Sequence, residues 1–182
     1  MNMEKKFELT DNFIINAFGV KLFQIKCTKS FKYAKEGDLG GYVEKDENLD
    51  QESDAWVYGN AWVYGNARVS GNAWVSGNAR VSGNAEVYGN AWVYGDARVY
   101  GNAEIDNNNK HCGFDCFGSA NRHTHAYLTK ENKVEITCGC FRGSIEEFEK
   151  RVEETHSGTI YEKQYKAIID VIKIKFGLTD LI

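Results

Sequence analysis

The chain has 182 residues, of which 42% are hydrophobic, enough for one repeat domain and a small second domain. Its formal net charge of −4 argues against general binding to nucleic acid or to an anionic membrane, because such proteins usually carry a basic field. No apolar run approaches the roughly 18 residues of a membrane span, and residues 1–11 lack the apolar core of a secretory signal. Five cysteines without the spacing of a secreted disulfide scaffold favour a reducing cytoplasm.

Residues 1–42 are expected to form an N-terminal β cap. Two apolar runs, 13–15 and 20–25, are typical of strands, and the residues between them form a turn. The repeat that follows this segment is interpreted below as a β-helix. A β-helix exposes unpaired strand edges at its ends, and a cap is needed to cover them.

Residues 55–102 consist of eight consecutive six-residue units, which read AWVYGN, AWVYGN, ARVSGN, AWVSGN, ARVSGN, AEVYGN, AWVYGD and ARVYGN. Ala-x-Val-x is a short strand with one buried face, and Gly-Asn or Gly-Asp tolerates the positive φ of a corner. Hairpins would reverse the chain at every corner, whereas a coil that always turns the same way keeps Ala and Val inside. The repeat therefore predicts a single-stranded parallel β-helix over residues 43–106, with 18 residues per turn and about three coils.

The units GNAxVY and GNAxVS resemble the repeats of hexapeptide left-handed β-helix proteins, above all YdcK-like and phage or prophage members. The resemblance covers roughly residues 22–106 and includes the leader LFQIKC…KEGDLGGYVEKDENL at residues 22–49. It implies that the helix is left-handed. In the acyltransferase branch of this superfamily, Gly directly follows the aliphatic residue, whereas here Gly comes two positions after Val. The coils also contain none of the histidines or insertion loops that those enzymes use.

Outward side chains 18 residues apart should stack in columns, and several of these columns are aromatic. Stacked aromatic residues stabilise neighbouring rungs by about 0.2–1 kcal/mol per pair. A contiguous apolar patch also marks an interface, so we expect homo-oligomerisation, and relatives of this fold suggest a trimer. The predicted interface comprises Trp56, Trp74, Trp92, Tyr58, Tyr94 and Trp62.

Residues 107–182 are expected to form a separate α/β domain, because the repeat ends there and four of the five cysteines and all four histidines appear. Ser144 and Glu147 match the capping box that begins a helix. The expected elements are a loop at 107–118, strands at 126–129 and 134–138, a helix from Ser144 and a second helix at 161–175.

This domain resembles a C-terminal domain of phage and prophage repeat proteins for which no activity is established. The shared features are a Cys-Gly-Cys-Phe-x-Gly stretch, a following helix and a histidine. In this chain they are Cys138, Gly139, Cys140, Phe141, Gly143 and His156.

Three kinds of chemistry are open to this domain. A dense run of hydrogen-bond donors could hold a phosphate or carboxylate, with Arg122 making bidentate contacts, although it could equally be a polar loop that satisfies its own backbone. The predicted ligand-binding residues are Ser119, Asn121, Arg122, His123, Thr124, His125, Tyr161 and Tyr165. No cofactor is expected, but zinc is an alternative with Cys112, Cys116, Cys138 and Cys140 as ligands. The third possibility is a cysteine nucleophile, Cys138 or Cys140, with a histidine base.

The preferred hypothesis is a non-enzymatic binding protein of phage or prophage type. Its β-helix would be an oligomerising scaffold, and its C-terminal domain would bind a small anionic ligand or a host protein. One form is an anti-defence protein that sequesters a nucleotide-like signal. The alternatives are a hexapeptide-type acyltransferase and a purely structural assembly protein.

Overall fold

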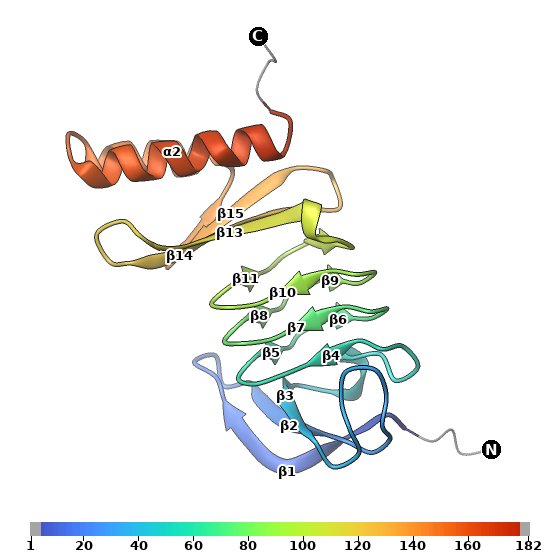
Figure 1. The fold of residues 1–182 in the computed structure, drawn as a ribbon. Coiled ribbons are helices and arrows are strands. Elements are labelled where there is room, and N and C mark those ends of the chain that lie inside the picture. Colours follow the sequence, from blue (N-terminus) through green and yellow to red (C-terminus); the bar gives the residue numbers. More distant parts are fainter. Residues whose placement is uncertain (1–4, 179–182) are drawn as a thin grey trace. The chain divides into compact units, whose positions relative to one another are not determined.

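The computed structural model describes residues 5–178, which are mainly β (Figure 1). The chain divides into two compact units, the first ending at Asn108 and the second beginning at Asn109. The first unit is a β-solenoid with an N-terminal cap, and the second is a small sheet with two helices.

The solenoid consists of two-residue strands that pair in parallel with the strand 18 residues further on (Figure 1). Three ladders result, and they contain β4–β7–β10, β5–β8–β11 and β6–β9–β12. The predicted 18-residue register is thereby confirmed. The strands are β4 Trp56–Val57, β5 Trp62–Val63, β6 Arg68–Val69, β7 Trp74–Val75, β8 Arg80–Val81, β9 Glu86–Val87, β10 Trp92–Val93, β11 Arg98–Val99 and β12 Glu104–Ile105.

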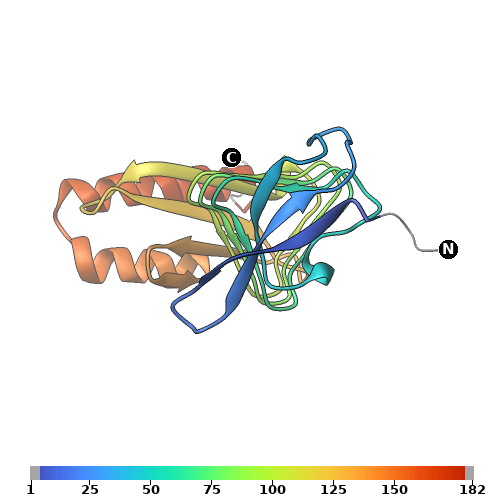
Figure 2. The same ribbon diagram turned by 90° about the horizontal axis from the view of Figure 1, so that it is seen from below.

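The interior of the coils is filled by the alanine and valine of each unit, all of them buried. The glycine of each unit has a positive φ, for example +68° at Gly71 and +69° at Gly77. The following asparagines stack above one another, and Asn78 Nδ2 donates to Asp96 Oδ1 of the next coil at 2.9 Å. The view along the solenoid in Figure 2 shows the successive coils superimposed.

The N-terminal cap continues one ladder of the solenoid. Its strands β1 Phe7–Ile15, β2 Lys21–Cys27 and β3 Leu39–Val43 pair antiparallel, and β3 then pairs in parallel with β5. A 3₁₀ turn, η1 at Asp46–Asn48, and a bridge from Leu49 to Val69 extend the coil below β6. The leader thus contributes a turn of solenoid in addition to the three that the repeat predicts.

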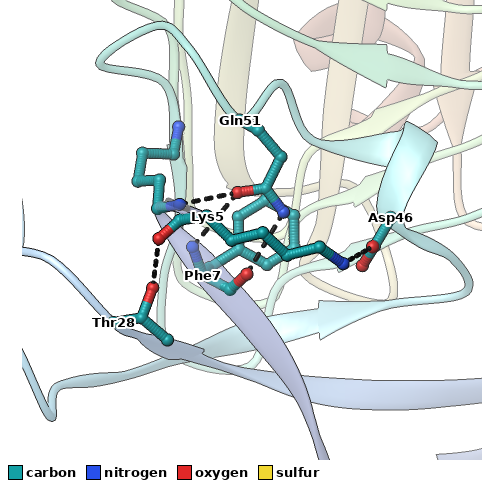
Figure 3. Close-up of polar contacts among 6 residues, drawn as sticks. Lys5, Phe7, Thr28, Asp46 and Gln51 are labelled. Atoms are coloured by element: carbon teal, nitrogen blue, oxygen red, sulfur yellow. Dashed lines mark hydrogen bonds and ion pairs between the residues drawn. The ribbon is translucent and has the colours of Figure 1, made fainter. Parts of the chain in front are cut away.

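A buried lysine fastens this cap to the first coil. Lys6 is 6% exposed, and its Nζ donates to the carbonyl oxygens of Asp50, Ser53 and Ala55 at 2.6, 2.7 and 2.8 Å. Burial lowers the pKa of the Lys6 ammonium to about 8, so it remains charged at pH 7. The carboxamide of Gln51 also accepts from the backbone N–H groups of Lys6 and Phe7, and it donates to the Phe7 carbonyl (Figure 3). These bonds satisfy part of the outer edge of β1.

The predicted tryptophan column exists, but its lower end is covered by the cap. Trp56 pairs with Trp74, and Trp74 with Trp92, as the 18-residue period requires. The expectation that Trp56 is accessible is wrong: it is 0% exposed, because the rings of Phe7 and Phe31 pack against it at 6.4 and 5.3 Å between centroids. Trp74 is half-buried beside Tyr33.

The second unit is a four-stranded antiparallel sheet in the order β13–β14–β15–β16, packed against two helices. Alternate strand residues such as Ala126 and Ile136 form a core with Phe148 and Ile169 of the helices. A 3₁₀ turn, η2 Asn108–Lys110, spans the boundary between the units. The elements that follow are β13 His111–Phe117, β14 Arg122–Leu128, β15 Val134–Cys138, β16 Phe141–Gly143, α1 Ile145–His156 and α2 Ile160–Lys175.

The expectation of a loop at 107–118 is wrong, because β13 occupies most of that range. Cys112 and Phe114 alternate along β13 and pack on the helix side of the sheet. The strand was not predicted because Gly113 interrupts the alternation of side chains and because the end of the strand is irregular, with a φ of +63° at Cys116. The capping box at Ser144 is confirmed, since its Oγ accepts from Glu147 N and its N–H donates to Glu147 Oε2. Within residues 5–178, neither helix has the length and apolar character needed to span a membrane.

Replacing Lys6 tests how the cap is held. We expect Lys6→Met to lower the free energy of unfolding at pH 7 by about 2–4 kcal/mol, because carbonyl oxygens that now accept from the ammonium lose their partner. The measurement is urea unfolding followed by tryptophan fluorescence, which reports the first unit because all four tryptophans lie between residues 56 and 92. The matched control is Lys5→Met, whose exposed ammonium pairs with Asp46 at 2.5 Å, and this variant should unfold almost like the wild type. Equal effects of the two substitutions would contradict the proposed role of Lys6.

Candidate functional site

The second unit contains a groove of about 780 Å³. The start of β14, the turn from β15 to β16, one side of α1 and the first half of α2 all contribute to it. This volume lies in the range of small-molecule sites, which is roughly 300–1,000 Å³.

The lining of the groove is rich in cations. It has four arginine or lysine side chains against two glutamates. Arg142 is neutralised by Glu135, to which it donates two hydrogen bonds at 2.8 and 3.0 Å. Within the part of the chain that the structure describes, no carboxylate forms an ion pair with Arg122, Lys150 or Arg151. The groove thus has three cationic side chains available for an anion.

Aromatic rings form the inner wall of the groove. His156 stacks on Tyr165 with 5.5 Å between ring centroids, and Phe148 meets Tyr165 edge-on at 5.6 Å. Phe141 is only partly buried and lies 5.0 Å from Phe148. The rings come from β16, α1 and α2, and their mutual contacts hold them in place.

Arg122 lies against the turn between β15 and β16. Gly139 in this turn has a φ of +59°, and a Cβ atom there would come within 2.5 Å of the Arg122 guanidinium. A side chain at position 139 would therefore displace Arg122. The glycine of the Cys-Gly-Cys stretch therefore leaves room for the Arg122 side chain.

The two cysteines beside Gly139 also line the groove but differ in exposure. Cys138 is buried, accepts from Thr124 Oγ1 at 3.3 Å and lies 3.8 Å from Tyr165 Oη. Cys140 is exposed. Burial, with a smaller contribution from Cys138, raises the pKa of Tyr165 to about 12, so Tyr165 keeps its proton at neutral pH.

The structure separates the predicted ligand-binding residues into different places. Arg122 and Tyr165 are brought together in the groove. Because side chains alternate along β14, Thr124 faces the helices, whereas His123 and His125 face the other side of the sheet. Ser119 and Asn121 are exposed in the turn before β14, and exposed Tyr161 lies 6.0 Å from His156 between ring centroids.

The histidines on the far side of the sheet have partners of their own. His123 Nδ1 bonds to Asp115 Oδ1 at 2.5 Å, and His125 Nε2 lies 3.0 Å from His111 Nδ1. They therefore do not contribute to the groove.

Among the groove residues that were missing from the predicted site are Phe141, Lys150, Arg151 and His156. Two of them, Phe141 and His156, belong to the motif that carries the resemblance of the C-terminal domain. Lys150 and Arg151 lie on exposed turns of α1 and look like ordinary surface residues in the sequence.

The four cysteines considered as zinc ligands do not converge. Cys112 lies on β13 and Cys138 on β15, with β14 between them, and Cys116 and Cys140 are exposed. Among residues 5–178, no group of three or more His, Cys, Asp or Glu side chains is placed to hold a metal ion.

A family model for the YdcK beta solenoid repeat matches the coils at residues 61–77, 73–89 and 79–95. Residues 61–95 are thus similar to the YdcK beta solenoid repeat. This agrees with the resemblance of their sequence and with the stacked parallel ladders of the structure. No curated protein matches the chain. The matched residues lie in the solenoid, and none of them lines the groove of the second unit.

Cys112 gives a pH-dependent test of the second unit. Burial raises the pKa of its thiol to about 11 from an ordinary value of 9.0. Since only the thiolate reacts, alkylation of Cys112 in the native protein should accelerate about tenfold per pH unit from pH 8 to pH 10. Peptide mapping after brief iodoacetamide treatment measures this, with urea-unfolded protein as the control, in which the rate should level off near pH 9. A native rate that also levels off near pH 9 would contradict the burial of Cys112.

Proposed function

We propose that this chain is a non-enzymatic binding protein whose C-terminal unit captures a small anionic ligand in the groove. The observation that carries the proposal is the set of three cationic side chains, Arg122, Lys150 and Arg151, that line one groove without an ion-pair partner among residues 5–178. Cationic side chains that are not already paired favour a bound anion, because hydrogen bonds between charged groups are stronger than those between neutral groups.

The proposal includes the finer assignments made from the resemblance. The solenoid is proposed to be left-handed and of the hexapeptide type, and the protein to be of phage or prophage type, with capture of a host defence signal as its role. The rigid coils would then carry the binding unit. The acyltransferase alternative has less support, since residues 55–102 contain no His, Cys or Lys that could act as a base.

Self-association remains part of the proposal, with a smaller surface than the full tryptophan column. Tyr58, Trp92 and Tyr94 are 50%, 51% and 64% exposed, whereas Trp56 is buried. Exposed aromatic residues of this kind are enriched in interfaces. A homo-oligomer, proposed to be a trimer, would form its contact through these exposed aromatic side chains.

Titration with inorganic pyrophosphate tests the proposed function. We expect calorimetry to detect binding by the full chain and Arg122→Ala to weaken it about 10–100-fold, since a hydrogen bond to a charged group contributes roughly 1.5–3 kcal/mol. The control is Lys163→Ala, which removes an exposed charge of α2 outside the groove. If pyrophosphate does not bind, or if both variants bind it like the wild type, the groove is not the anion site.

A further inference from the structure

We propose that the ligand of this groove is a nucleotide, with a planar base held at Phe141 and its phosphates held by Arg122 and the two cations of α1. This inference rests on the proposed capture of an anion and specifies its chemical class.

The size and the placement of the cations favour a ligand with more than one anionic group. Arg122 comes from the start of β14, whereas Lys150 and Arg151 are adjacent residues of α1. A groove of about 780 Å³ is far larger than a single phosphate and is in the range of drug-sized ligands. A chain of phosphates, or phosphates at both ends of a molecule, would engage cations from both elements.

The aromatic wall favours a planar ring in the same ligand. Phe141 lies beside Cys140 and is partly exposed, while its ring packs on buried Phe148 at 5.0 Å. The ring is therefore held in place yet accessible, which is the property of a stacking platform. Bases stack on such rings regardless of their identity, because every base has a π-face.

An acidic peptide suits the groove less well. An extended peptide would need a free strand edge for its backbone hydrogen bonds. The edge strand that lines the groove, β16, has only three residues, and beyond it the Ser144 N–H is already bonded to Glu147 at 2.8 Å. The groove thus offers cations and rings but little backbone for strand pairing.

Comparison of three kinds of probe on the full chain tests this inference. The probes are sodium triphosphate, which has charge alone, adenosine, which has a ring alone, and two nucleotides, ATP and cyclic di-AMP. We expect at least one of the two nucleotides to bind ten or more times tighter than triphosphate. Adenosine should bind more weakly than that nucleotide and more weakly than triphosphate. Phe141→Leu should weaken nucleotide binding much more than triphosphate binding, so that the advantage of the nucleotide is lost. Arg122→Gln should weaken both, and the control Lys163→Gln should weaken neither.

A second measurement needs no variant. The bound nucleotide should slow alkylation of exposed Cys140, which lines the groove beside Phe141, and leave exposed Cys116, which does not line it, unaffected. Triphosphate should protect Cys140 less. If both nucleotides bind no tighter than triphosphate and protect Cys140 no better, the nucleotide inference is wrong while anion capture stands. If triphosphate and the nucleotides all fail to bind, the proposed function fails as well.

Discussion

The solenoid depends on the close contact of backbone with backbone at its corners. The corner glycines from Gly59 to Gly101 all have a positive φ, and those from Gly59 to Gly83 also lie against the corner glycine of the next coil. A Cβ atom at Gly71 would come within 2.8 Å of Gly89 N, and one at Gly83 within 2.9 Å of Gly101 N. Only glycine satisfies both the conformation and the contact, so the six-residue spacing of glycines fixes the six-residue spacing of corners. Stacking of identical coils then puts alanine and valine inside and aligns every outward residue with the residue 18 positions away.

Much of the fold could be predicted from the sequence because the repeat is local and uninterrupted. The register of Trp56, Trp74 and Trp92 follows from counting alone. The repeat period could not show that Phe7 and Phe31 cover Trp56. These two contacts join residues about 49 and 25 positions apart, outside any periodic pattern. Nor could it show the buried Lys6, because in the sequence Lys5 and Lys6 look alike while one faces solvent and the other binds three carbonyl oxygens.

The candidate site was only partly predictable for a related reason. Hydrogen-bond donors adjacent in the sequence, Arg122 to His125, are divided by the pleat of β14 between two sides of the sheet. The groove instead unites Arg122 with α1, about 30 residues further along the chain. The motif that contains Gly139 and His156 was recognisable in the sequence, but the contacts of these residues were not. Gly139 makes room for Arg122, and His156 stacks on Tyr165.

Disulfide formation between neighbouring coils tests the stacking most directly. Asn78 and Asp96 lie 18 residues apart, and their side chains are hydrogen-bonded at 2.9 Å. Adjacent strands are separated by about 4.8 Å, which is within the Cα separation of a disulfide. In the variant Asn78→Cys/Asp96→Cys, mild oxidation should join positions 78 and 96 within one chain, as peptide mapping would show. The variant Asn78→Cys/Asn90→Cys, with a spacing of 12, should not form the corresponding link. A link at a spacing of 12 and none at a spacing of 18 would contradict the stacked register on which this account rests.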